Sequence, residues 1–338
     1  MYEFSKLTEG GFSKLSVGLD KNMDFPIAIK YIEDAKLAQR EMKIIKDLQC
    51  SESQLIITMP LLGSSIDTLR YLKEENGLSV REVQAIGVLM LERIQMMHEL
   101  GYVHGDIKPE NILIYNTNKS FSAKASQYQI IKQRFIKKVE QPVLDQMSEM
   151  ETTSIQPQQL DSTDYVKRGQ QDLVLIDFGN ARKYIKNENG KIIHKNKAKK
   201  SFYVCTLGYA SVSQSMGNTL SRRDDLESLF YTLINLIGLR LDEISDLNRS
   251  QALIERNPLY ADDEEYQNQM DLIELKLNIN QKSLSSINLP ESFIKFWSYL
   301  NKLNFKDEPD YDYLIKLFSK SLIKRQFFPC PEGKEEIN

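Results

Sequence analysis

Residues that build metal clusters and disulfides are scarce in this chain. Its 338 residues include three cysteines and three histidines. Cys50, Cys205 and Cys330 are odd in number and lie far apart, without the close pairing of a zinc site or a disulfide framework. We therefore expect reduced thiols and an intracellular protein, located in the cytoplasm or also in the nucleus.

Long apolar runs and a strong excess of charge of one sign are also missing. The longest apolar stretches, such as "LINLIGL" at 233–239, are far shorter than the roughly 20 residues of a membrane span. The first ten residues contain no apolar region of the kind that a signal peptide needs. The formal net charge of -3 argues against nucleic-acid binding. We expect a monomer whose partners include neither a membrane nor nucleic acid.

The composition that remains is that of a globular protein, with 41% hydrophobic and 27% charged residues. Short alternating runs before residue 60 predict a small antiparallel sheet, and apolar residues at helical spacing predict a helix over 34–48. Farther along, the pattern predicts a long helix over 78–101, closed by a glycine. It also predicts helices over 226–239 and 293–303.

These elements place the chain in the α+β class as one domain over 1–338. A small β-rich lobe is followed by a larger, mainly helical lobe, and we expect no long regulatory tail after it. The expected boundaries are about 1–60 for the small lobe, 60–63 for a hinge, 64–327 for the large lobe and 328–338 for a short tail.

Residues 116–171 interrupt the large lobe. The stretch is rich in Gln, Ser, Thr and Lys, and its hydrophobicity falls after Gln141, so we expect a mobile or disordered insert. The alternative is that 127–140 forms a helix whose apolar face docks a partner. Because loop closure costs little more for a long loop than for a short one, the insert can leave a hairpin whose ends stay paired.

The segment "HGDIKPEN" at 104–111 carries the parts that phosphoryl transfer requires. Asp106 can orient an attacking hydroxyl and accept its proton, and Lys108 can reach a γ-phosphate. Asn111 can bind a magnesium ion through its amide oxygen. These three residue types at this spacing indicate the catalytic loop of a phosphotransferase.

Three more residues complete the set. Asp177 follows the apolar strand "LVLI" and precedes a Phe-Gly pair, as a second magnesium ligand would. Lys30 in "IAIK" sits on a strand and could meet the phosphates of ATP, held by an ion pair with Glu41 in the following helix. Taken alone, each of these residues would be interpreted as an ordinary surface residue. The occurrence of all six in this order is not expected by chance.

The whole set resembles the protein kinase superfamily. The segment "TLGYASVSQSMGNTLSRRDDLESL" at 206–229 is similar to the marker of the casein kinase 1 family, as are "REMKIIKDLQ", "MPLLGSSIDTL" and "LNKLNFKDEPDYDYLIKLF". The resemblance covers roughly residues 4–327 without the insert. It implies a bilobal protein kinase fold, ATP and Mg²⁺ as cofactors, and Ser/Thr of proteins as acceptors. It also implies that Asp225 supports the catalytic loop.

The resemblance further implies an adenine site. Met59 would lie at its back, and the Pro60 carbonyl and the Leu62 backbone N–H would meet the adenine edge. The apolar walls, for which plain core packing is the alternative, would be Leu15, Ala28, Leu113 and Ile176. In the phosphate-covering loop "TEGGFS", Gly10 and Gly11 are present, but Thr8 and Ser13 stand where the family has glycines, so we expect slow turnover.

Gly105 departs from the pattern, because most protein kinases have an Arg there that gathers a phosphate on the activation segment. We therefore predict activity that does not depend on such phosphorylation. His-Gly-Asp also resembles the vaccinia-related kinases and the aminoglycoside and choline kinases. Lys108 and Pro109 favour a protein kinase over a small-molecule kinase.

Eight basic residues and one acid lie between Asn180 and Ser201. This charge would attract acidic or phosphorylated protein substrates, or it belongs to a solvated loop. The candidate substrate-binding residues are Lys183, Lys199 and Lys200. The family's anion-binding Arg is replaced by Gly208, so the need for a phosphorylated substrate stays open.

The function that we predict is an ATP- and Mg²⁺-dependent protein Ser/Thr kinase of the casein kinase 1 group. The alternative is a catalytically weak pseudokinase that acts as a scaffold, with the insert as its docking element.

Overall fold

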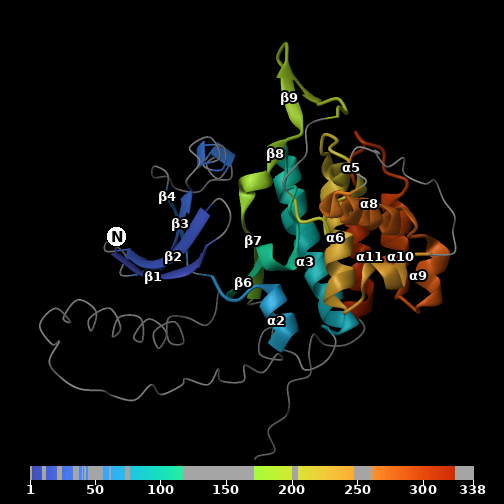
Figure 1. The fold of residues 1–338 in the computed structure, drawn as a ribbon, viewed down its shortest axis with the longest axis horizontal. Helices are drawn as coiled ribbons and strands as arrows, with labels where there is room; N and C mark the ends of the chain where they lie inside the picture. The colour runs from blue at the N-terminus through green and yellow to red at the C-terminus, as the bar shows by residue number, and fades with distance from the viewer. Residues whose placement is uncertain are drawn as a thin grey trace, which may run out of the picture. The chain divides into compact units, whose positions relative to one another are not determined.

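The computed structural model describes residues 2–9, 13–20, 25–32, 38–39, 41, 43–44, 56–60, 62–72, 77–116, 171–199, 205–246, 260 and 262–323 (Figure 1). The chain divides into two compact units, residues 1–63 with 114–172 and residues 64–113 with 173–338. One boundary between the two units follows Gly63. The expectations for Gly10, Gly11, Lys200, the body of the insert and the tail at 328–338 lie outside the described residues.

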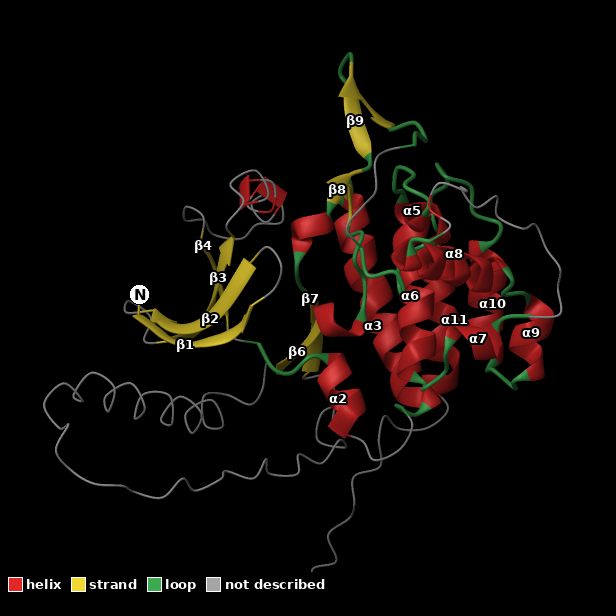
Figure 2. Cartoon of the chain, viewed as in Figure 1, coloured by secondary structure: helices red, strands yellow, loops and turns green. Residues whose placement is uncertain are grey.

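The first unit contains a four-stranded sheet in the order β1-β2-β3-β4, with antiparallel neighbours throughout (Figure 2). The strands are β1 (Tyr2–Glu9), β2 (Ser13–Asp20), β3 (Phe25–Ile32) and β4 (Ile56–Pro60). The predicted small antiparallel sheet is confirmed. Ala38, Glu41 and Ile44 are helical and buried, and their spacing of three residues is that of a helix face turned toward a core.

The second unit is mainly helical. Its helices are α2 (Ile66–Leu72), α3 (Val80–Glu99), α5 (Val212–Ser215), α6 (Arg222–Leu236), α7 (Leu241–Ile244), α8 (Glu264–Leu277), α9 (Gln281–Ser286), α10 (Glu291–Leu300) and α11 (Tyr311–Ile323). Short β5 (Tyr102–Val103) pairs with β8 (Arg182–Lys183), and the 3-10 turns η1 (Pro109–Asn111) and η4 (Phe178–Asn180) lie at the candidate site.

Helix α6 forms the centre of this unit, because its apolar residues point in all directions and a helix of that kind is stable only inside a core. Leu226, Leu229, Phe230 and Leu233 have no exposed surface. Helices α3 and α10 pack against α6, and α11 packs against α3 (Figure 1). The ring of Trp297 lies 4.7 Å from that of Phe230. Residues carried by α6 are therefore held rigidly.

The long helix α3 begins and ends where its sequence predicts. Ser79 and Glu82 form a capping box, in which the Ser79 N–H donates to Glu82 Oε2 over 2.8 Å. At the other end Gly101 has φ of +83°, and a Cβ there would overlap the Ile185 side chain. Glycine is therefore required to end the helix and lead the chain into β5.

Two further pairs of strands form small two-stranded sheets. Strands β6 (Ile112–Asn116) and β7 (Gln171–Leu175) form a two-stranded sheet, so the expectation that the ends of the insert stay paired is confirmed. Strands β9 (Ile185–Glu188) and β10 (Lys191–His194) form a hairpin whose turn residues, Asn189 and Gly190, both have positive φ. Asn-Gly is the preferred sequence for such a two-residue turn.

None of the helices in the described ranges combines the length and the apolar character that crossing a membrane would require.

The paired ends of the insert generate a prediction. Replacing residues 118–168 with a short Gly-Ser linker should leave the described elements folded, because β6 and β7 pair with each other on either side of it. We expect a single cooperative thermal transition by calorimetry, measured beside the full chain. Loss of cooperative unfolding would show that the insert belongs to the core.

Candidate active site

The candidate site is built on the loop His104–Asn111, whose backbone is fixed from α5 and α6. The buried carboxylate of Asp225 accepts the His104 N–H over 2.7 Å and the Gly105 N–H over 2.8 Å. The Gln214 side-chain amide donates to the Gly105 carbonyl over 2.7 Å. Side chains thus bond two backbone N–H groups and one carbonyl at the start of the loop. These bonds fix its conformation in the absence of regular secondary structure.

Asp225 is held in its charged form by its neighbours. Burial by itself would raise its pKa, but the hydrogen bonds from His98 and from the Gly105 N–H outweigh burial and lower it. His98 Nε2 donates to Asp225 over 2.9 Å, and its Nδ1 bonds the hydroxyl of Tyr311 on α11. Burial raises the pKa of Tyr311, so the hydroxyl remains a donor. Three helices therefore meet at this carboxylate.

Gly105 is required by the conformation of the loop. Its φ is +76°, a region that side chains disfavour. A Cβ there would lie 2.9 Å from Leu220 Cδ1 and 3.1 Å from the Asn180 carbonyl oxygen. Leu220 packs with Val103 and Tyr184 in a buried cluster. An Arg at this position would need this packing to move, which explains the glycine between His104 and Asp106 in this chain.

Asp106 lies at the centre of a network of side chains. Its Oδ1 accepts from Thr206 Oγ1 over 3.1 Å. Its Oδ2 accepts from Asn111 Nδ2 over 3.2 Å and from Lys108 Nζ over 3.0 Å. Lys108 Nζ also donates to Thr206 Oγ1 over 2.7 Å. The structure thus brings together the three residues predicted in the loop and adds Thr206, which sequence analysis missed because it is about a hundred residues distant.

Asp177 is joined to this network through the backbone. The Ile176 N–H donates to the Asn111 carbonyl over 2.9 Å, and His104 Nε2 donates to the Ile176 carbonyl over 3.1 Å. Burial lowers the pKa of His104, and its Nδ1 accepts the Asp106 N–H, so the imidazole is neutral. Asp177 itself has φ of +66°, which is uncommon for a residue other than glycine. Backbone of this kind is often found at functional sites.

The oxygens of this site fit a magnesium ion. Both hydrogen bonds of the Asn111 side chain use Nδ2, to the backbone carbonyl and the carboxylate of Asp106, so the amide oxygen has no protein partner among the described residues. Asp177 is exposed. Magnesium takes one or two such protein oxygens and keeps several waters. Over the described ranges, no group of three or more His, Cys, Asp and Glu side chains forms a closed metal cage.

The first unit holds the second group of predicted residues. Lys30 Nζ and Glu41 Oε1 are 2.8 Å apart, with exposed side-chain fractions of 12% and 2%. The strand register pairs Leu15 with Lys30 and Ala28 with Met59, which places these four positions on one face of the sheet. The predicted ion pair is therefore present.

The other residues expected around adenine are distributed over the two units. Pro60 ends β4 opposite Ile27, and Leu62 is half-buried in the segment that follows. Leu113 on β6 and Ile176 are also half-buried, and both lie in the second unit.

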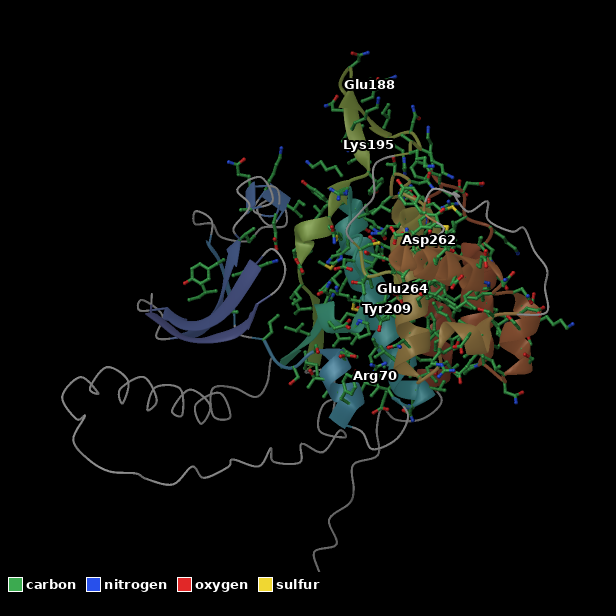
Figure 3. All side chains as sticks on the ribbon, viewed as in Figure 1. Arg70, Glu188, Lys195, Tyr209, Asp262 and Glu264 are labelled. Atoms are coloured by element: carbon green, nitrogen blue, oxygen red, sulfur yellow. The ribbon has the colours of Figure 1, made fainter. Side chains whose placement is uncertain are left out.

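The predicted substrate-binding lysines are partly engaged. Lys183 lies over the Tyr102 ring, with Nζ 5.0 Å from its centroid, and Lys195 Nζ donates to the Lys183 carbonyl over 2.6 Å. Lys199 is exposed and forms a β-bridge with Asn218. Figure 3 shows Lys195 and Glu188 along the β9–β10 hairpin. Lys199 shares its exposed position with Lys186, Lys191 and Lys197.

Comparison with known proteins connects this geometry to protein kinases. No protein-family model matches the chain. It is 24% identical over 329 residues to a probable serine/threonine-protein kinase of Dictyostelium discoideum. The aligned region covers 93% of the chain and 52% of that protein. It is 27% identical over 263 residues to a casein kinase 1-like protein of Oryza sativa subsp. japonica, which covers 78% of the chain and 28% of that protein.

A probable casein kinase I homologue of Encephalitozoon cuniculi is 24% identical over 333 residues, with 93% of the chain and 82% of that protein covered. The chain spans about half the length of the Dictyostelium relative and under a third of the rice relative. The similarity, at low identity, is to protein kinases that include casein kinase 1-like proteins.

The anchoring carboxylate gives a stability prediction. Asp225→Asn should lower the free energy of unfolding by about 3 kcal/mol, because buried N–H donors lose a charged acceptor. The whole difference in the free energy of unfolding should be present at neutral pH. The difference should shrink as the pH falls below 3.8, the ordinary pKa of an Asp carboxyl, and through the lowered pKa of Asp225, because the wild-type carboxylate is then protonated as well.

Urea unfolding at pH 7 measures this effect, with exposed Asp312→Asn on α11 as the matched control. The control should stay within about 0.5 kcal/mol of the wild type. An Asp225→Asn protein as stable as the control would contradict the anchoring role.

Proposed function

We propose that the chain is an ATP- and Mg²⁺-dependent protein Ser/Thr kinase of the casein kinase 1 group, with a bilobal kinase fold formed by its two units. The observation that carries this proposal is the network of Asp106, Lys108, Asn111 and Thr206, with Asp177 attached through the backbone. The similarity to protein kinases supports it.

In the proposed reaction, a Ser or Thr hydroxyl of the substrate donates to the Asp106 carboxylate, which orients it and accepts its proton. A bond forms between the hydroxyl oxygen and the γ-phosphorus, and the bond from that phosphorus to the β,γ-bridging oxygen breaks. ADP leaves with the electrons of that bond. Lys108, held by Thr206 over 2.7 Å, places a positive charge beside the transferred group.

The residues of the first unit would bind ATP. Lys30, fixed by its ion pair with Glu41, would contact the α- and β-phosphates. The sheet face that carries Leu15, Ala28 and Met59 supplies apolar positions for adenine. We propose that the remaining adenine contacts come from Pro60, Leu62, Leu113 and Ile176.

Asn111 and Asp177 would hold magnesium, which when bound neutralises the charge of the phosphate groups. The protein's own contribution is orientation, because Asp106 fixes the Asn111 amide and Asn111 in turn fixes the chain beside Asp177.

The proposed substrates are acidic or phosphorylated proteins. The support is the surplus of basic residues over 182–199, of which Lys199 is exposed. Gly208 stands where the family has an anion-binding Arg, so a priming phosphate is not part of the proposal.

Transfer of labelled γ-phosphate from Mg-ATP to casein and to an acidic Ser peptide tests the function. Asp106→Asn should slow transfer by about 10²–10⁴-fold, because the general base is lost. ATP binding should persist, and Asp312→Asn should transfer at the wild-type rate. If the wild type binds Mg-ATP but transfers nothing, the scaffold function replaces the kinase function.

Gly105 generates a second test. Because it offers no guanidinium to a phosphate on the activation segment, dephosphorylated protein should keep its full transfer rate. Phosphatase treatment followed by the same transfer assay measures this. Activity that is abolished by the phosphatase and restored through a phosphosite in 180–206 would contradict the prediction.

A further inference from the structure

Lys276, near the end of α8, is 1% exposed and is the most deeply buried lysine among the described residues. A buried ammonium group is costly unless it is hydrogen-bonded and compensated. Lys276 is not among the residues proposed above to bind ATP, magnesium or the acceptor hydroxyl. Its partners therefore show what the fold gains from this position.

The ammonium group binds backbone carbonyls rather than a carboxylate. Lys276 Nζ donates to the Leu207 carbonyl over 2.5 Å and to the Ala210 carbonyl over 2.6 Å, and it lies 4.7 Å from the Tyr231 ring centroid. Burial lowers its pKa to about 8, while the charge of nearby Glu227 acts in the opposite direction.

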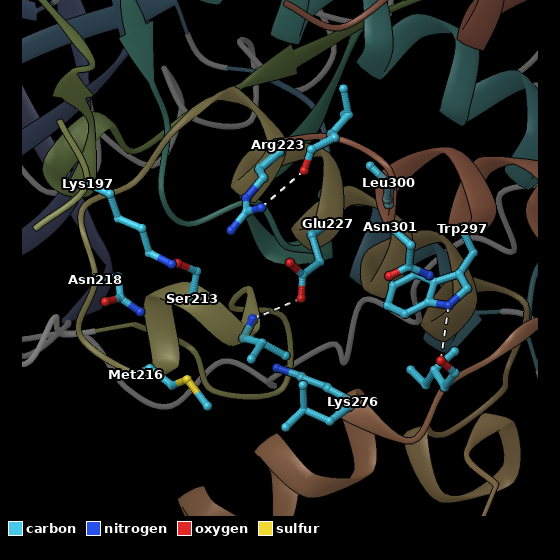
Figure 4. A pocket seen from close by; sticks show the side chains of 14 residues that line it. Lys197, Ser213, Met216, Asn218, Arg223, Glu227, Lys276, Trp297, Leu300 and Asn301 are labelled. Atoms are coloured by element: carbon cyan, nitrogen blue, oxygen red, sulfur yellow. Dashed lines mark hydrogen bonds between the residues drawn. The ribbon is translucent and has the colours of Figure 1, made fainter. Parts of the chain in front are cut away.

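Glu227 extends the same arrangement. Its carboxylate accepts the Val212 N–H over 2.9 Å and the Tyr231 hydroxyl over 2.7 Å. Figure 4 shows Glu227 and Lys276 in one cavity, with Glu227 bonded to the first residue of α5. Residues of α6 and α8 thus hold the backbone of 207–212 from one side.

The segment that Lys276 binds is the turn that carries Thr206. The Thr206 carbonyl accepts the N–H groups of Tyr209 and Ala210, each over 3.0 Å. On its other side, the Tyr209 hydroxyl donates to Asn235 over 3.1 Å, and Arg70 binds the same Asn235 oxygen. Figure 3 labels Tyr209 and Arg70. The turn is therefore held by Lys276 on one side and by Asn235 on the other, and the Thr206 hydroxyl points to Asp106 and Lys108.

We infer that Lys276 is a positioning residue for phosphoryl transfer, which acts on Asp106 and Lys108 through the 206–210 turn and the Thr206 hydroxyl. The inference rests on the proposed function. Lys276 touches no reacting atom, and its effect is to fix the donor that orients Asp106.

The cavity beside Lys276 allows a direct test by chemical rescue. It has a volume of about 280 Å³ and is lined by Lys276, Glu227, Ser213 and Trp297 among others. In Lys276→Ala the missing atoms correspond to n-propylamine, which can enter this space. The rate constant kcat for transfer to casein should fall on the order of 100-fold, with a much smaller change in KM for ATP. Adding n-propylammonium chloride should raise the kcat of Lys276→Ala by about tenfold or more, whereas the same concentration of sodium chloride should leave it unchanged.

Two further variants serve as controls. Lys276→Met keeps the side-chain volume, so it should fold and lose the same activity, but the amine should not rescue it because its space is filled. Ser213→Ala lies in the same cavity, and its Oγ has no hydrogen-bond partner among the described residues. It should keep kcat within about twofold of the wild type, because it removes no contact to the turn.

A double-mutant cycle and hydrogen exchange complete the test. In a Thr206→Val background, Lys276→Met should cost little further kcat, because the two residues act in one path. The Tyr209 and Ala210 amides should exchange faster in Lys276→Met, whether or not the chain transfers phosphate.

Unchanged exchange, unchanged kcat, absence of rescue or full additivity with Thr206→Val would each overturn the positioning role. A wild type that transfers nothing, with exchange changed as predicted, would instead contradict the kinase function alone.

Discussion

The candidate site depends on one buried carboxylate. Asp225 is carried by α6, the helix at the centre of the helical core, and it accepts the first two N–H groups of the His104–Asn111 loop. Because α6 is packed on all sides, it cannot shift without opening the core. The loop is therefore placed by core packing, and Asp106 takes its position from a helix that it does not belong to.

A second set of hydrogen bonds connects the loop to the segment that follows Cys205. Thr206 bridges Asp106 and Lys108, and its turn is tied to α8 by Lys276. His104 and Asn111 connect the loop to Asp177 by backbone hydrogen bonds. The polar groups that phosphoryl transfer would use are thus oriented by partners that are themselves fixed, an arrangement that lowers the reorganisation needed during reaction.

Much of this architecture could be predicted from local sequence. The Ser79–Glu82 capping box and Gly101 define α3, and alternation of apolar residues defines β1–β4. The Lys30–Glu41 pair was also predicted, and it is present. Residues such as Thr206, Lys276 and Gln214 could not be found in this way, because their partners lie 66 to 109 positions away and no local pattern encodes such contacts. The β9–β10 hairpin was not predicted, because its strands, IKNE and KIIH, lack the alternating apolar and polar residues of a half-buried strand, although its Asn-Gly turn is a hairpin signal.

We propose that this set of side chains binds Mg-ATP for transfer to a hydroxyl. The most direct measurement is a crystal structure of the chain with Mg²⁺ and a non-hydrolysable ATP analogue. We expect magnesium bound by both Asn111 and Asp177, with Lys30 on the nucleotide phosphates and Asp106 facing the γ-phosphate. A nucleotide bound without either metal ligand, or with its phosphates remote from Asp106, would contradict it.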